Sequence, residues 1–214
     1  MQIIELRDAL PRVFAGREPV PSQVWQCQLR LERGKHYLIV AESGTGKSSM
    51  CSYIYGYRRD YSGTITFDGA DIGTLTVPQW CEVRRTGIAY LPQEMRLFGE
   101  LTALENVQLK NRLTNHKSEE EILGLFARLG LADKVHTPAA RLSIGQQQRV
   151  AIVRTLCQQA DFFLLDEPVS HLDETNNAIV AQLFTAEADR QGAAIIVTSV
   201  GNHLLLDYDE ELRL

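Results

Sequence analysis

The sequence lacks the cysteine pairs and the long apolar runs that mark disulfide-rich, zinc-binding and membrane-spanning proteins. Its four cysteines, at positions 27, 51, 81 and 157, are far apart and include no Cys-x-x-Cys pair. This spacing indicates neither a disulfide framework nor a zinc site, and we expect buried free thiols in a reducing compartment. The most apolar stretches, "FFLL" and "AAIIV", are far shorter than the roughly 18 residues that span a bilayer.

A basic surplus and a secretion signal are missing as well. The chain has 27 acidic and 22 basic residues, a formal net charge of −5, so no overall field attracts a nucleic acid and no such partner is expected. The pairs Arg58-Arg59 and Arg84-Arg85 are interpreted as solvated surface. The opening residues "MQIIELRDALPR" lack the basic start and apolar centre of a signal peptide. We therefore expect a cytosolic chain, and a separate polypeptide for any membrane part.

What the sequence does contain is an alternation of strand-like and helix-like segments, in a chain of 214 residues that suits one medium domain with an inserted lobe. Strands are predicted at 23–32, 35–41, 63–69, 87–93, 161–167, 193–199 and 210–214. Helices are predicted at 47–55, 118–130, 143–160 and 175–191. This alternation predicts an α/β fold with a mainly parallel sheet, into which residues from about 94 to 145 insert a helical lobe.

One loop carries the pattern of a phosphate-binding site. The residues "AESGTGKSS" follow a predicted buried strand and open a helix, where backbone amides and the positive helix end converge on phosphate. Gly46, Lys47 and Ser48 fit the pattern, and Gly44 and Gly46 can adopt the positive φ that the loop requires. Ala41 stands where the first glycine belongs. Since it falls at the strand end, where extended dihedrals suffice, we expect this substitution to cost little.

Polar residues elsewhere complete a set suited to phosphate chemistry. Lys47 is expected to reach the β- and γ-phosphates, and the Ser48 hydroxyl to bind Mg²⁺. Asp166 and Glu167 end a predicted buried strand, a place that suits Mg²⁺ and water because an unpaired buried carboxylate is expensive. Gln93 ends another predicted strand, and its side-chain amide could reach both the metal and an attacking water.

A second anion site is indicated far along the chain, where Ser143 and Gly145 stand at a helix start. Backbone amides and a hydroxyl at such a place can bind an anion, although, taken alone, this serine is better explained as a plain N-cap.

In this order the motifs resemble those of the ATP-binding cassette (ABC) family, from about residue 3 to the end of the chain. "SGTGKS" is similar to the Walker A loop, "FFLLDE" to Walker B, "LSIGQ" to the signature sequence, "SHLD" to the D-loop and Gln93 to the Q-loop residue. The resemblance implies a P-loop NTPase with added N-terminal antiparallel strands, in one cassette domain over 1–214. Residues 1–93 and about 146–214 would form its nucleotide-binding core, and about 94–145 its helical subdomain.

The resemblance also implies ATP as substrate and Mg²⁺ as cofactor. Glu167 would orient and deprotonate the attacking water, Lys47 would offset the developing charge, and Ser48, Gln93 and Asp166 would hold Mg²⁺. Phe14 lies where the family places an aromatic residue that stacks on adenine. The residues implied in binding the nucleotide are Phe14, Ser43, Gly44, Thr45, Gly46, Lys47, Ser48 and Ser49.

A second cassette and membrane subunits are the partners that the resemblance implies. Two cassettes would enclose two ATP molecules, with Ser143, Gly145 and Gln146 on the partner's ATP and Asp173 at the dimer contact. "EMRLFGELTALENVQL" resembles the stretch that receives a helix of a separate membrane subunit, which implies a place on the cytoplasmic face. The segment "LFGELTALENV" is most similar to the lipoprotein-release and macrolide-export branch.

The chain departs from the family where a histidine usually contacts the γ-phosphate, because Ser199 occupies that place. Serine can donate only one neutral hydrogen bond, so we expect hydrolysis that is slow or partner-dependent, and a solvent-exposed His203. Two alternatives stay open: a degenerate cassette that binds ATP and regulates a more active partner, and a soluble cassette acting on ribosomes or DNA. The span from Lys47 to Ser143 leaves no room for the long insertions of the DNA-acting type.

Overall fold

The computed structural model describes residues 1–16, 21–42 and 44–214, and Ser43 therefore lies outside the described residues. The described strands form two sheets. A four-stranded antiparallel sheet has the order β2-β1-β4-β5, and a five-stranded parallel sheet has the order β6-β7-β8-β3-β9. The antiparallel strands are β1 (Ile3–Pro11), β2 (Gln28–Glu32), β4 (Tyr61–Phe67) and β5 (Ala70–Asp71). The parallel strands are β3 (His36–Val40), β6 (Ile88–Leu91), β7 (Phe162–Asp166), β8 (Ala194–Ser199) and β9 (Glu210–Arg213).

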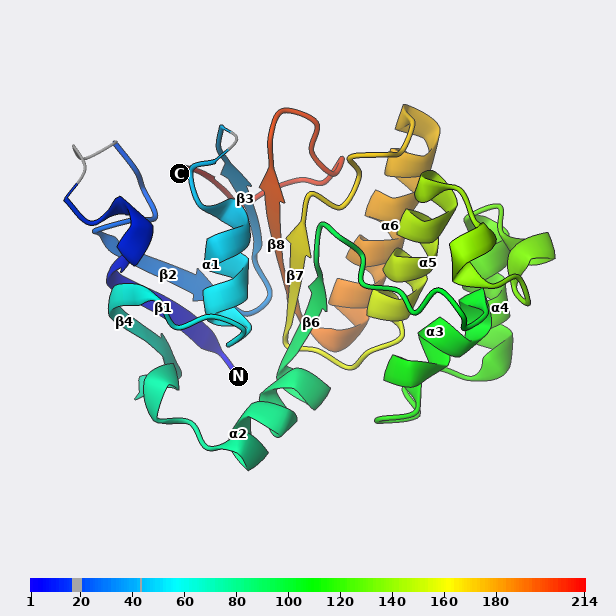
Figure 1. The fold of residues 1–214 in the computed structure, drawn as a ribbon, viewed down its shortest axis with the longest axis horizontal. Helices are drawn as coiled ribbons and strands as arrows, with labels where there is room; N and C mark the ends of the chain where they lie inside the picture. Colours follow the sequence, from blue (N-terminus) through cyan, green and yellow to red (C-terminus); the bar gives the residue numbers. More distant parts are fainter. Residues whose placement is uncertain (17–20, 43) are drawn as a thin grey trace.

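Helices cover both faces of the parallel sheet (Figure 1). Helix α1 lies between the antiparallel and the parallel sheet, α5 and α6 lie on the opposite side, and α3 and α4 lie beyond them. The α-helices are α1 (Lys47–Ile54), α2 (Val77–Glu82), α3 (Ala103–Asn111), α4 (Glu119–Arg128), α5 (Ile144–Leu156) and α6 (Glu174–Gln191). This arrangement confirms the predicted α/β fold with a parallel central sheet.

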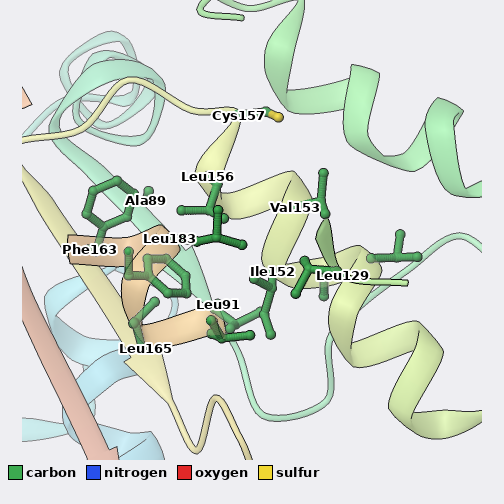
Figure 2. Packing of buried hydrophobic residues seen from close by; sticks show 14 of the residues in the cluster. Ala89, Leu91, Leu129, Ile152, Val153, Leu156, Cys157, Phe163, Leu165 and Leu183 are labelled. Carbon is green, nitrogen blue, oxygen red and sulfur yellow. The ribbon is translucent and has the colours of Figure 1, made fainter. Parts of the chain in front are cut away.

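Strand β7 shows why the parallel sheet is apolar on both faces. Phe162 and Leu164 pack in the cluster that contains α1 and the antiparallel sheet, whereas Phe163 and Leu165 pack in the cluster that contains α5 and α6. All four side chains are fully buried, because successive residues of a strand point to opposite faces. Figure 2 shows Phe163 and Leu165 among side chains of the α5 side. The strand therefore holds its last residue, Asp166, rigidly at the carboxyl edge of the sheet.

A buried ion-pair cluster ties the connection between α3 and α4 to α6. Glu187 accepts from Lys117 Nζ (2.7 Å), from Arg190 and from Gln191, and its Oε1 lies 2.8 Å from His116 Nε2. Burial opposes ionisation of Glu187, but the hydrogen bonds from His116, Arg190 and Lys117 outweigh it and lower its pKa to about 2. The cluster therefore fixes the α3–α4 region against the rest of the fold.

Several local predictions are wrong or too long. The strand predicted from 23 begins only at Gln28, because Gln26 turns the chain with a φ of +56°. The helix predicted to reach 160 ends at Leu156. The thiols are free, but only Cys51 and Cys157 are buried, whereas Cys81 is exposed.

Of the two basic pairs, only Arg84 differs from the expectation of solvated surface, whereas Arg58, Arg59 and Arg85 are exposed. Arg84 is half-buried against Trp80 and donates to the carbonyls of Tyr55 and Gly56. Across 1–16, 21–42 and 44–214, none of the helices has both the length and the apolar character that crossing a bilayer requires.

Candidate functional site

The phosphate loop has the backbone that its glycines predict. Gly44 and Gly46 have φ values of +85° and +107°, and Gly46 is the N-cap of α1. A Cβ atom on Gly46 would lie 3.1 Å from Phe14 Cε2 and 3.2 Å from Trp25 Cζ2, so both the dihedral and the space require glycine. Ala41 is not among the described residues with positive φ. The backbone at position 41 therefore does not require glycine, and the small cost to nucleotide binding stays a prediction.

Lys47 begins α1 and lies over the loop. Its side chain is 5% exposed, and Nζ donates to the carbonyl oxygens of Glu42 (2.9 Å) and Ala41 (3.3 Å). Burial lowers the pKa of Lys47, and the nearby carboxylates of Glu167 and Asp166 act in the opposite direction. The ammonium group is therefore held at the loop by weak carbonyl partners that an anion can replace.

Asp166 is held by its neighbours at the carboxyl end of β7. It is 1% exposed and accepts a 2.6 Å hydrogen bond from Thr198 Oγ1. Burial raises the pKa of Asp166, although the hydroxyls of Thr198 and Ser48 act to lower it. The sequence analysis did not single out Thr198. Its contact with Asp166 arises from the pairing of β7 with β8, which sets Thr198 opposite Asp166.

Glu167 follows with a strained backbone. Its φ is +50°, a left-handed conformation that costs a non-glycine residue energy and that concentrates at functional sites. Its amide donates to the carbonyl of Thr198 at 3.0 Å, which fixes the turn. The side chain is thereby brought out of the sheet edge and lines a cleft.

That cleft, of about 560 Å³, brings most of the predicted nucleotide residues together. Loop, strand-end and N-terminal residues meet there although they are far apart in the sequence. The lining residues are Val13, Phe14, Gly44, Gly46, Lys47, Ser48, Ser49, Arg58, Gln93 and Glu167. Phe14 is half-buried beside the loop, as an adenine-stacking residue must be. The volume and the cationic loop suit a nucleoside triphosphate.

Two residues of this region escaped sequence reasoning. Arg58 lines the cleft and donates from Nη1 to Ser49 Oγ at 2.9 Å, while Asp60 pairs with its other nitrogens. Arg58 is exposed, as expected for solvated surface, but it also contacts the phosphate loop through Ser49. Trp25 Nε1 donates to the carbonyl of Thr45 at 3.1 Å and so fixes the loop. No motif marks either residue, because both act through the folded chain.

The second predicted anion site lies elsewhere on the molecule. Ser143 caps α5: its Oγ accepts from the amide of Gln146 (3.3 Å), and Gln146 Oε1 accepts from the amide of Ser143 (2.9 Å). Ser143 and Ile144 are exposed, and Gly145 packs beneath the His171 carbonyl. Ser143, Gly145 and Gln146 are not among the described residues that line the cleft. The two predicted anion sites are thus separate in the folded chain.

Three further predicted residues have structural partners of their own. Ser199 is 1% exposed and donates to the Asn202 carbonyl at 2.7 Å. His203 is half-buried beside Tyr208, so the expectation of solvent exposure is wrong. Asp173 caps α6 by accepting from the amide of Asn176 at 2.8 Å, a bond that lowers its pKa. Neither Ser199 nor His203 is among the described residues of the cleft.

Comparison with known proteins identifies the family. Residues 24–170 match the profile of the family described as "ABC transporter". The chain is 35% identical over 185 residues to the uncharacterized ABC transporter ATP-binding protein YvrO of Bacillus subtilis (strain 168), a match that covers 85% of this chain and 80% of YvrO. It is 33% identical over 200 residues to the macrolide export ATP-binding/permease protein MacB of Sodalis glossinidius. That match covers 92% of this chain and 30% of MacB, so the chain spans less than a third of the MacB length.

Solved structures agree with the sequence matches. The dimeric structure of MJ0796, a bacterial ABC transporter cassette, aligns with a TM-score of 0.76 and 28% identity over 91% of this chain and 87% of that one. A post-hydrolysis dimer of MJ0796 bound to ADP and Pi aligns with a TM-score of 0.77 and 25% identity over 93% and 88%. The resemblance to the macrolide-export branch is confirmed, and the transporter reading is favoured over the soluble and the degenerate alternatives. The chain belongs to the ABC transporter family, as one of its ATP-binding and ATP-hydrolysing cassettes.

Proposed function

We propose that this chain drives a transporter by closing on a second cassette around ATP and coupling that closure to separate membrane subunits. The single observation that carries the proposal is the separation of the two anion-binding features. The cleft at Lys47 holds the residues for one nucleotide, whereas Ser143 at the start of α5 is exposed and does not line that cleft. A second copy supplies the missing half, since a two-fold dimer uses the same two patches on both subunits.

Within each site, the roles follow from placement. The amides of Gly44, Gly46 and Lys47 bind the phosphates, Lys47 replaces its carbonyl contacts by the β- and γ-phosphates, and Phe14 stacks on the base. We infer that Thr45, Ser49 and Ser43, the last outside the described residues, complete this contact.

Magnesium fits the oxygen donors that converge here. The Ser48 hydroxyl lies close enough to Asp166 to act on the pKa of its carboxyl group, and Ser48 and Gln93 line the same cleft. Hydroxyl, carboxylate and amide oxygens are the ligands that Mg²⁺ prefers. These residues would hold the ion, which when bound neutralises phosphate charge. Thr198 keeps the Asp166 carboxylate in place for this role.

Hydrolysis is an in-line displacement at the γ-phosphorus. A water oxygen forms the new P–O bond as the bond to the β–γ bridging oxygen breaks, and Glu167 takes the proton of the water. ADP and phosphate leave. The strained turn at Glu167 fixes the carboxylate at the cleft, so little reorganisation is needed at the moment of reaction.

The partners are inferred from the relatives. The names of the MacB proteins join an ATP-binding part to a permease, and MJ0796 is a dimer in its solved structures. We infer that a second cassette, identical or related, and separate permease chains assemble with this protein on the cytoplasmic face of a membrane. We retain the division into a core of 1–93 and about 146–214 and a helical subdomain of about 94–145. We also infer that Ser143, Gly145, Gln146 and Asp173 form the interface with the second cassette.

The test is ATP-dependent dimerisation of the Glu167→Gln variant. Loss of the base is expected to slow turnover by about 10²–10⁴-fold while binding persists, so ATP with Mg²⁺ should shift the variant from monomer to dimer in sedimentation. The matched control is Glu167→Gln with Lys47→Ala, which should remain a monomer. A Glu167→Gln protein that hydrolyses ATP at the wild-type rate, or that stays monomeric when saturated with ATP, contradicts the proposal.

A further inference from the structure

A basic side chain outside the phosphate-loop motif lines the nucleotide cleft. Arg58 follows the end of α1, and its Nη1 donates to Ser49 Oγ at 2.9 Å. Its guanidinium carbon lies 5.3 Å from the centroid of the Tyr53 ring. The neighbouring Arg59 is exposed and is not among the described residues that line the cleft. Arg58 therefore differs from its neighbour in being directed along α1 toward the phosphate loop.

Asp60 holds the guanidinium in this position. Its Oδ1 accepts from Arg58 Nε at 2.9 Å and its Oδ2 accepts from Nη2, a planar two-point contact. The hydrogen bond from Arg58 lowers the pKa of Asp60, so both groups are charged at neutral pH. The two side chains are 44% and 45% exposed, and ion pairs as exposed as this one add little to stability. The value of the pair lies in the direction that it gives to Arg58.

A second set of contacts ties this pair to the base end of the cleft. The carbonyl of Asp60 accepts from the Arg12 amide at 2.9 Å and from the Tyr53 hydroxyl at 3.2 Å. Arg12 begins the short turn that ends with Phe14, the residue assigned to the base. The arginine is thus anchored before a nucleotide binds, which lowers the entropy lost when it pairs with one.

The guanidinium keeps donors for an anion. It has five N–H groups and no acceptor. Among the described residues, Asp60 and Ser49 accept from three of these groups, which leaves one N–H on Nη1 and one on Nη2. An oxyanion that binds beside Ser49 therefore meets a charged donor that is already in place.

The order of residues along the cleft indicates which phosphate this is. Lys47 marks the end where the γ-phosphate reacts, and Phe14 marks the end that takes the base. Arg58 lies between them, because it contacts Ser49, two residues beyond Lys47 in α1, and its anchor is bonded to Arg12, two residues before Phe14. In a nucleoside triphosphate, the phosphate nearest the base is the α-phosphate.

We propose that Arg58 binds the α-phosphate of the nucleotide by donating from Nη1 beside Ser49. This inference rests on the proposed function, because it adds a residue to the same nucleotide site. The α-phosphate is unchanged when the bond between the β-γ bridging oxygen and the γ-phosphorus breaks, so the contact is equally strong with ATP and with ADP. Such uniform binding raises the affinity for nucleotide without speeding the chemical step, and it retains ADP after phosphate leaves.

The experiment measures the nucleotide affinity of the full chain by equilibrium dialysis. Arg58→Gln removes the charge, and Arg59→Gln is the matched control. We expect Arg58→Gln to weaken the binding of ATP and of ADP by the same factor, about tenfold, and to change adenosine affinity by less than about twofold. Arg59→Gln should change all three affinities by less than about twofold. Lys47→Ala, in contrast, should weaken ATP more than ADP, because Lys47 reaches the β- and γ-phosphates.

A sulfur substitution tests the contact at the level of single atoms. The two diastereomers of ATP in which sulfur replaces one α-phosphate oxygen are measured on the wild type and on Arg58→Gln. Sulfur accepts hydrogen bonds weakly, so the diastereomer with sulfur toward Arg58 should bind the wild type about threefold or more weaker than ATP. This difference should disappear in Arg58→Gln, since a penalty that depends on the presence of the partner indicates a direct contact.

Three results overturn the inference. One is equal ATP affinity of Arg58→Gln and Arg59→Gln, another is an effect of Arg58→Gln that differs between ATP and ADP or extends to adenosine, and the third is a sulfur penalty that is absent from the wild type or unchanged in Arg58→Gln. If one of these occurs while Glu167→Gln still dimerises with ATP, the proposed function stands and only the inference fails. A wild type that binds no ATP, together with a monomeric Glu167→Gln, refutes both.

Discussion

Replacing Thr198 by valine tests how the Asp166 carboxylate, the proposed Mg²⁺ ligand, is held. Valine has nearly the shape of threonine but cannot donate the 2.6 Å hydrogen bond to Asp166. Thr198 and Asp166 are 0% and 1% exposed, so water cannot replace the lost donor. A hydrogen bond to a charged group contributes about 1.5–3 kcal/mol, and we expect the free energy of unfolding at pH 7 to fall by this amount.

A matched control separates the effect of losing a hydrogen bond to a charged group from the effect of losing a buried hydroxyl group. Thr155 is 3% exposed, and its Oγ1 donates to the neutral carbonyl of Ala151 at 2.9 Å. Thr155→Val should lower the free energy of unfolding by about 0.5–1.5 kcal/mol. Urea unfolding, followed by circular dichroism, measures both variants.

The pH dependence gives the sign of the effect. Because the pKa of Asp166 is raised in the folded protein, the folded state binds a proton more readily than the unfolded state, and ionised Asp166 destabilises the fold above that pKa. Thr198→Val raises the pKa further, so the deficit should be largest at neutral pH and shrink as the pH falls through the raised pKa. Magnesium-dependent ATP affinity should fall by about 10–100-fold, since Thr198 orients the proposed metal ligand Asp166. An effect of Thr198→Val equal to that of Thr155→Val at every pH would refute the reasoning.

Three further variants have separate outcomes. Gly46→Ala should weaken ATP binding by about tenfold or more in equilibrium dialysis, because Gly46 has a φ of +107° and lies against two aromatic rings. The control Gly124→Ala should leave ATP binding unchanged, because a Cβ at that position meets nothing within 4 Å. Similar ATP affinities of the two variants would contradict this prediction. Glu187→Gln should lower the free energy of unfolding at pH 7 by about 3 kcal/mol. Because the pKa of Glu187 is lowered to about 2, this difference in stability between the variant and the wild type should disappear as the pH falls from 4.5 toward 2. A difference that stays constant over this pH range would contradict the prediction. Ser199→Ala should change the rate of single-turnover ATP hydrolysis by less than about twofold, because the Ser199 hydroxyl donates to the Asn202 carbonyl. A rate about a hundredfold lower would instead assign Ser199 a catalytic role.

The predictions from the sequence are most accurate where the functional residues are close together in the chain. Lys47, Gly46 and Ser48 are adjacent in the chain, and their loop follows a strand and opens a helix as the pattern requires. Asp166 and Glu167 end a strand whose apolar run is buried on both faces. Such features depend on neighbouring residues and on a period of two, and both are visible in a single sequence.

Contacts between distant segments could not be predicted in the same way. Thr198 reaches Asp166 through a strand pairing that joins residues 32 positions apart. Arg58 enters the cleft because α1 ends early and the chain turns back toward Ser49.

Mixing two inactive variants tests the central claim most directly. Lys47→Ala destroys the cleft and Ser143→Arg blocks the start of α5, so each homodimer is expected to hydrolyse almost no ATP. A mixed dimer contains one intact site, built from the cleft of the Ser143→Arg copy and the α5 start of the Lys47→Ala copy, so an equimolar mixture should recover about a quarter of wild-type hydrolysis if the sites act independently. A mixture that stays as inactive as its components, although the two variants are shown to form mixed dimers, would contradict the shared site.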